Sequence, residues 1–236
     1  GSRGLIFRRV YEYPFWQIDS SASRWEWDVA KASYDPAAVS GAEAARFYSA
    51  WQKRLYGDAT HNLSRDGIVY VPLQGKLQEK RSFQVCSPIE MLENCLAHDP
   101  GRRIIATIHP NENYSAREIA ALDKLERDNS RLRVEAGGMI PLLQTCDYVV
   151  TQNSSVAFAG YFFGKPALLF GNIDFHHIAI KADMTYLATA FTNVAQARPN
   201  YARYLYWFWQ TQSINAGRDD VHSKIAARFE RFGWPM

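Results

Sequence analysis

The chain has 236 residues, a formal net charge of +3, 47% hydrophobic residues and 22% charged residues. This length and composition predict an ordinary globular protein, with one large domain or one domain and an appendage, that buries a core without staples. The charge is small and no run of basic residues accompanies it, which argues against a nucleic-acid partner.

The cysteine count excludes two further classes. There are three cysteines and no C-x-x-C pattern, so neither a disulfide framework nor a structural zinc site is expected. We expect Cys86, Cys95 and Cys146 to be small buried side chains in the reduced state, which suits the cytoplasm. No signal peptide and no apolar run approaching the roughly 18 residues of a membrane span is visible. The expected localisation is therefore cytoplasmic, with at most a peripheral contact with the inner membrane.

The segment 1–66 is irregular and rich in aromatic residues, and all seven tryptophans of the chain lie outside residues 52–206. One helix is predicted over 41–56, because its apolar side chains recur at helical spacing. We expect the aromatic residues to pack this segment onto the main domain. The alternative is an exposed aromatic surface for a partner, a lipid or a sugar.

The segment 67–185 alternates short β-rich runs with amphipathic helices. Strands are predicted over 68–73, 103–108, 132–135, 148–151 and 166–170, and helices over 87–98, 115–128, 140–145 and 154–163. Such alternation predicts right-handed crossovers and a parallel sheet, and near-continuous apolar strands indicate that helices cover both faces. The expected fold class is α/β, a Rossmann-like parallel sheet with flanking helices. Residues 186–236 are predicted to form C-terminal helices that pack on this domain.

Polar residues and glycines follow every predicted strand, at the edge where parallel sheets bind ligands. They are Gln74-Gly75, His109-Pro110-Asn111, the segment 135–138, the segment 152–155 and Gly171-Asn172. The recurrence at one edge favours a binding site there.

The run Asn153, Ser154 and Ser155 lies between a buried strand and a helix. Its hydroxyls and the free amides of the first helical turn can bind an anion such as a phosphate, although one of these residues could instead merely cap the helix. His109 could donate to a phosphate, or it could only order the turn after its strand. No metal is expected at His176-His177, and without a D-x-D motif a metal-bridged diphosphate site is not expected either.

Five short motifs, taken in order, resemble the capsular polysaccharide biosynthesis family that includes the Kdo transferases of capsule export systems. The motifs are Val71-Pro72-Leu73-Gln74, Ile108-His109-Pro110, the run 152–158, Gly164-Lys165-Pro166 and Phe170-Gly171. Their layout is also similar to that of bacterial sialyltransferases that use CMP-sugars. The resemblance covers about residues 67–178. The chain departs from the pattern in having Thr107-Ile108 where many relatives have a lysine before the His-Pro pair.

The resemblance implies a GT-B glycosyltransferase, of which 236 residues can supply the donor-binding half. It implies that His109, Asn153, Ser154 and Ser155 hold the nucleotide phosphate and that Gln74 lies near the donor. An acidic residue often follows the glutamine in the family, and here only Glu79 does, so Glu79 is the candidate base. The implied partners are a nucleotide sugar, CMP-Kdo in the specific case, and a lipid or polysaccharide acceptor at the inner membrane or export machinery. No metal cofactor is implied.

Two other functions stay open from the sequence. A nucleotide-sugar epimerase has a similar scaffold and would suit His109-Pro110-Asn111. A non-catalytic binding or scaffolding module of polysaccharide assembly would suit a chain that lacks a second lobe.

Overall fold

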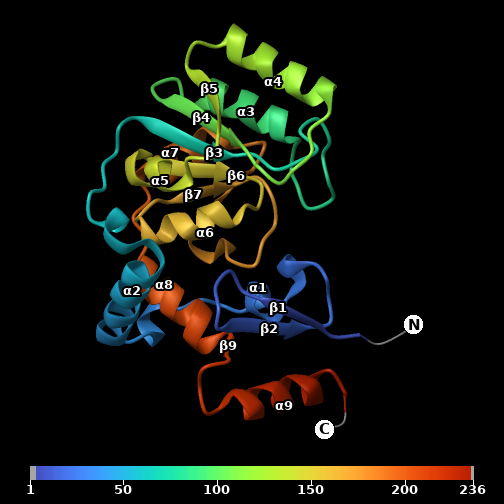
Figure 1. Cartoon of the computed structure of the whole chain (residues 1–236), viewed down its shortest axis with the longest axis vertical. Coiled ribbons are helices and arrows are strands. Elements are labelled where there is room, and N and C mark those ends of the chain that lie inside the picture. Colours follow the sequence, from blue (N-terminus) through green and yellow to red (C-terminus); the bar gives the residue numbers. More distant parts are fainter. Residues whose placement is uncertain (1–3, 235–236) are drawn as a thin grey trace. The chain divides into compact units, whose positions relative to one another are not determined.

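The computed structural model describes residues 4–234. The chain divides into two compact units, each assembled from segments distant in sequence (Figure 1). Unit 1 draws on Gly1–Trp51, Ile173–His177 and Asn200–Met236, and unit 2 on Gln52–Asn172 and Ile178–Pro199. Within the described residues, no helix has both the length and the apolar character that crossing a membrane requires.

Unit 2 contains a six-stranded parallel sheet in the order β5-β4-β3-β6-β7-β8. This is the strand order of a doubly wound Rossmann fold, in which the chain direction across the sheet reverses next to its first strand. The reversal lies between β3 and β6. The predicted α/β fold class is confirmed. The strands are β3 (Ile68–Pro72), β4 (Arg103–Ile108), β5 (Leu132–Ala136), β6 (Tyr148–Thr151), β7 (Ala167–Leu169) and β8 (Ile180–Lys181).

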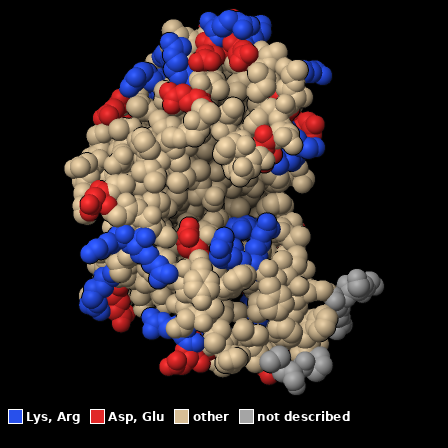
Figure 2. All heavy atoms as spheres, viewed as in Figure 1, with Lys and Arg blue, Asp and Glu red and all other residues tan. Residues whose placement is uncertain are grey.

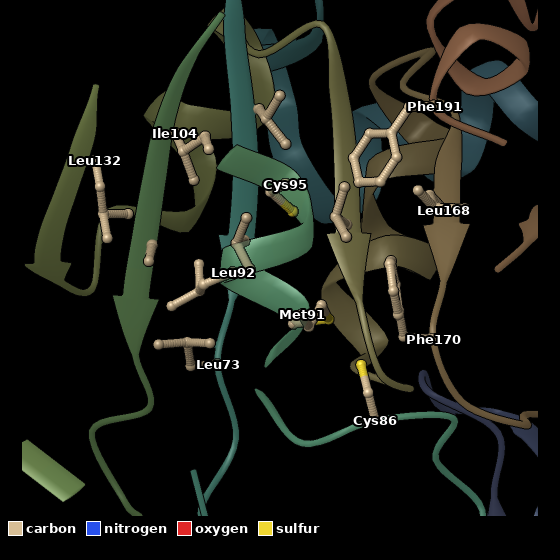
Figure 3. Packing of buried hydrophobic residues seen from close by; sticks show 14 of the residues in the cluster. Leu73, Cys86, Met91, Leu92, Cys95, Ile104, Leu132, Leu168, Phe170 and Phe191 are labelled. Atoms are coloured by element: carbon tan, nitrogen blue, oxygen red, sulfur yellow. The ribbon is translucent and has the colours of Figure 1, made fainter. Parts of the chain in front are cut away.

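Helices cover both faces of this sheet. On one face, α3 (Pro88–His98), α4 (Ala116–Asp128) and α7 (Leu187–Gln196) enclose the main hydrophobic core. Figure 3 shows Leu92 and Cys95 of α3 directed at the strands and Phe191 of α7 lying near Leu168. On the other face lie α5 (Met139–Thr145) and α6 (Ser155–Phe162), which pack on β3 and β6. Because both faces are covered, every residue of β3 and β6 is buried, which explains their continuous apolar sequence.

Local sequence signals set the helix ends. Ser87 begins α3 and Ser115 begins α4, each in a reciprocal capping box with the glutamate three residues later. Gly164 follows α6 with a φ of 64°, a conformation that glycine adopts without strain.

Over α4, basic and acidic side chains lie beside one another on the face shown in Figure 2.

Unit 1 has a small antiparallel sheet of β1 (Ile6–Arg9), β2 (Phe15–Asp19) and β9 (Ile214–Asn215). The prediction of an irregular N-terminal segment missed β1 and β2. The other elements of unit 1 are η1 (Arg24–Glu26), α1 (Asp28–Lys31), η2 (Pro36–Ala38), α8 (Tyr201–Tyr206), the π-helical turn η5 (Trp207–Thr211) and α9 (Val221–Arg231). Two helices, α2 (Gly41–Tyr56) and η4 (His176–Ile178), continue from unit 1 into unit 2, and η3 (Gly57–Thr60) belongs to unit 2.

The core of unit 1 is aromatic. The rings of Phe15 and Trp209 stack with centroids 4.6 Å apart, and Trp51 packs edge-on against Trp209 at 5.1 Å. All three side chains are buried. The tryptophans at the two ends of the sequence therefore contribute to one core, while Phe7 and Tyr13 remain exposed.

Candidate functional site

The site residues expected from the sequence follow three neighbouring strands of unit 2. Gln74 follows β3, His109 follows β4, and Asn153, Ser154 and Ser155 follow β6. Because β4, β3 and β6 are adjacent and parallel, all five residues lie at the carboxyl edge of the sheet. The strand order reverses between β3 and β6, and this is the position at which doubly wound sheets form a ligand-binding crevice.

One side chain, Thr151, links the end of β6 to the end of β3 and to the start of α6. The Thr151 hydroxyl donates to the Pro72 carbonyl at 3.3 Å and accepts from the Ser154 amide at 3.3 Å. Ser154 then caps α6, since its Oγ accepts from the Val156 amide at 3.3 Å. The capping role considered for Ser154 is therefore present. Ser155 is exposed and Asn153 is half-buried, so the first turn of α6 presents polar groups next to its free amides.

His109 is exposed, and its surroundings fix its orientation. Its backbone amide donates to the Tyr114 hydroxyl at 2.9 Å, and its Nδ1 accepts from the Asn111 amide at 3.2 Å. A ring nitrogen that accepts carries no proton in the neutral form, so the proton of neutral His109 lies on Nε2. His109 therefore presents Nε2–H as a hydrogen-bond donor at this edge.

Glu79 lies in the loop between β3 and α3. Its side chain is 64% exposed and pairs with the Lys76 ammonium at 2.9 Å. Lys76 itself has a φ of 62°, in the left-handed region. Glu118 of α4 holds this loop, because one of its carboxylate oxygens accepts from the Leu77 amide at 2.5 Å.

Glu118 therefore links the loop after β3 to the start of α4. Its other carboxylate oxygen accepts from the amide of Ser115 at 2.9 Å and from its hydroxyl at 2.8 Å. These hydrogen bonds from Ser115 hold the pKa of Glu118 below its usual range.

Three further polar residues belong to this edge and were not singled out as site residues from the sequence. Gln84 and Arg81 lie in the loop between β3 and α3, and Gln152 follows β6. Within the described residues, Gln84 Nε2, Arg81 Nε and Gln152 Oε1 are buried without a hydrogen-bond partner, as is Oε1 of Gln74. An unsatisfied buried polar atom costs about 1–3 kcal/mol. Such atoms at the expected ligand-binding edge therefore indicate groups that a ligand could satisfy. The position of Gln152 directly after a strand was a usable sequence signal, whereas nothing local marks Gln84.

Gly171, which follows β7, brings the backbone close to this group. A Cβ atom at position 171 would lie 2.9 Å from the backbone oxygen of Gln152, which no side chain tolerates without movement. Glycine is therefore needed where these two segments meet.

The remaining candidate residues have structural roles. In unit 1, His176 Nε2 contacts the Ala30 carbonyl at 3.0 Å, and His177 contacts the Ala32 carbonyl and the Tyr204 hydroxyl, each at 3.1 Å. Among residues 4–234 no group of three or more His, Cys, Asp or Glu side chains is arranged to hold a metal. All three cysteines are buried and unpaired, as expected, and burial raises the pKa of Cys86 to about 11, which disfavours the thiolate.

The model of one protein family matches residues 47–215, from α2 to β9. The chain belongs to the capsule polysaccharide biosynthesis protein family. The matched range of this family includes every strand of the parallel sheet and every loop of the candidate site. No curated protein matches the chain.

Solved structures with similar folds include the beta Kdo 2,7 transferase KpsC of Thermosulfurimonas dismutans, at 15% identity and a TM-score of 0.46, covering 75% of this chain and 55% of that one. MnaA of S. aureus, solved with UDP, has 11% identity and a TM-score of 0.40 over 64% of this chain and 47% of that one. The wall teichoic acid polymerase TagF has 14% identity and a TM-score of 0.41 over 80% and 48%. The chain thus spans about half the length of these structures.

Proposed function

We propose that this chain is the donor-binding part of a glycosyltransferase of bacterial capsular or surface polysaccharide synthesis. One observation carries the proposal. At the reversal point of a Rossmann-type sheet, Gln74, His109 and the run 153–155 lie at the same edge as the N-terminus of α6. Membership of the capsule polysaccharide biosynthesis family also supports a role in polysaccharide synthesis.

The chemistry we propose needs only groups of this edge. Nε2–H of His109, the hydroxyl of Ser155 and the amides that begin α6 bind the phosphate of a nucleotide sugar, with Asn153 and Ser154 beside them. As the glycosidic bond to the phosphate breaks, these donors stabilise the charge that develops on the leaving nucleotide. No metal ion takes part in this proposal. The donor we propose is CMP-Kdo, on the resemblance of the His-Pro and Ser-Ser motifs.

A carboxylate must accept the proton of the attacking acceptor hydroxyl. We propose Glu79, because it is the acidic residue of the loop that carries Gln74; there it pairs with the Lys76 ammonium at 2.9 Å. The acceptor in this proposal is a lipid or a growing polysaccharide, reached by a cytoplasmic protein at the inner membrane.

The test compares two caps. Replacing Ser154 and Ser155 together by alanine removes the α6 cap and the phosphate hydroxyls, whereas Ser87→Ala removes the α3 cap alone. Each cap loss should cost about 1 kcal/mol of stability. We expect only the Ser154/Ser155 variant to lose affinity for CMP, measured by calorimetry. Unchanged CMP affinity in a folded Ser154/Ser155 variant would remove the phosphate assignment.

A further inference from the structure

The buried polar atoms without partners at the carboxyl edge of unit 2 have fixed identities. Gln84 Oε1 already accepts from the Arg81 amide at 2.8 Å, so the free end of this side chain is its Nε2 donor. Gln152 Nε2 already donates to the Cys86 carbonyl at 3.0 Å, so the free end of that side chain is its Oε1 acceptor. The two hydrogen bonds settle which end of each amide is free.

The two glutamines lie on segments that meet at Gly171. Gln84 forms a β-bridge with Gly171, and the amide of Val85 and the carbonyl of Phe83 bond to Phe170 and Asn172 on either side. Gln152 reaches the same place from β6, since its backbone oxygen lies closest to the Cβ position of Gly171. Both residues are more than nine-tenths buried, with exposures of 4% and 2%.

The atoms without partners include both hydrogen-bond donors and hydrogen-bond acceptors. Gln84 Nε2 and Arg81 Nε are donors, whereas Gln152 Oε1 and Gln74 Oε1 are acceptors. An ionised phosphate only accepts hydrogen bonds, so it can satisfy the donors but not the acceptors. Uncharged groups that both donate and accept, such as the hydroxyls of a sugar or the edge of a nucleobase, can pair with donors and acceptors alike. This chemistry differs from that of the amides and hydroxyls at the start of α6.

We propose that Gln84 and Gln152, together with Arg81 and Gln74, form a subsite for an uncharged hydrogen-bonding group of the donor, beside the phosphate site. This inference rests on the proposed function and deepens it. The group is either the nucleoside or the glycosyl part, which share this chemistry. The subsite would distinguish donors by the positions of their sugar hydroxyls or by the hydrogen-bonding groups of their base. A donor that leaves one of the buried glutamines without a hydrogen-bond partner would bind more weakly.

The test uses methionine, which keeps the length of glutamine without its polar ends. The variants are Gln84→Met and Gln152→Met, and the control is Gln144→Met. Gln144 Nε2 donates to the Ala59 carbonyl at 2.9 Å, so the control loses one hydrogen bond to a backbone carbonyl, as Gln152→Met does, without touching the subsite. The uncharged probes are cytidine, uridine and N-acetylglucosamine, followed by ligand-detected NMR. Inorganic pyrophosphate probes the α6 site, and CMP and UDP probe the proposed function.

We expect Gln84→Met and Gln152→Met to bind one class of uncharged probe about tenfold more weakly than the parent, as the loss of one hydrogen bond predicts. Their affinity for pyrophosphate should be unchanged. Gln144→Met should bind every probe with the affinity of the parent. Weaker nucleoside binding identifies the nucleoside part, and weaker N-acetylglucosamine binding identifies the glycosyl part. If the variants bind every uncharged probe as the parent does, or if the control loses as much, the buried atoms bond only to internal water and the inference is overturned. If the parent binds CMP and UDP, that result leaves the proposed function standing. If the parent binds no nucleotide, both fail.

Discussion

Replacing Glu118 by alanine tests whether one carboxylate holds two loops of the site together. Its two oxygens bond to the Leu77 amide, in the loop that carries Gln74, and to Ser115 at the start of α4, which follows the loop of His109. The variant loses both connections at once.

The chain contains a matched control for this variant. Glu90 forms the same capping box with Ser87 at the start of α3, through bonds of 2.7 and 3.3 Å. Among residues 4–234, the Glu90 carboxylate makes no hydrogen bond to another loop. Loss of a capping box should cost about 1 kcal/mol, so Glu90→Ala should lose about that much. Glu118→Ala also loses the hydrogen bond from Leu77, worth roughly another 1 kcal/mol at a half-buried position. We therefore expect Glu118→Ala to lose about twice as much stability.

Denaturant unfolding followed by circular dichroism measures the two free energies, and hydrogen exchange measures the Leu77 amide directly. We expect the Leu77 amide to exchange faster in Glu118→Ala and at the parental rate in Glu90→Ala. The pKa of Glu118 is depressed in the folded state, so its contribution is present above the unfolded value of about 4.3 and is lost as the pH falls through the folded value. Equal destabilisation of both variants, with unchanged Leu77 exchange, would refute the reasoning.

Two further predictions concern single positions. Gly171→Ala should destabilise unit 2 by about 1–3 kcal/mol, because the added Cβ would lie 2.9 Å from the Gln152 backbone oxygen. The control is Gly101→Ala, whose Cβ would meet nothing within 4 Å and which should change the free energy of unfolding by less than about 0.5 kcal/mol. Equal effects of the two variants in denaturant titrations would disprove the close approach. Burial raises the pKa of Asp174 in unit 1 to about 6, so its stabilising contribution is complete below the unfolded value of about 3.9 and is lost as the pH rises through about 6. Between pH 4 and pH 7 the parent should therefore lose up to roughly 3 kcal/mol of stability through Asp174, and Asp174→Asn should not show this loss. Identical pH profiles of stability for the parent and the variant would contradict this.

The parallel sheet could be predicted from the sequence because its central strands are buried on both faces. The run 103–108 is mostly apolar and partly β-branched, and the structure places β4 there. β1 could not be predicted in this way, since it exposes three of its four residues and carries no alternating pattern. β8 and β9 have two residues each, which is too short for any periodicity to register.

The candidate site was partly predictable for a similar reason. A parallel sheet places whatever follows its strands at one edge, so Gln74, His109 and Ser154 could be grouped before their positions were known. Gln84 could not be grouped with them, because it reaches this edge only when its loop pairs with Gly171, 87 positions further along the chain. Such pairing between distant segments leaves no local pattern in the sequence.

Calorimetric titration of the purified chain with CMP, UDP, GDP and ADP tests the central claim most directly. We predict saturable binding of CMP that weakens when Ser154 and Ser155 are replaced together by alanine. Binding of UDP alone would keep the nucleotide site and reject CMP-Kdo as the donor. The absence of binding by all four nucleotides would contradict the proposed donor-binding role and favour a non-catalytic part in polysaccharide assembly.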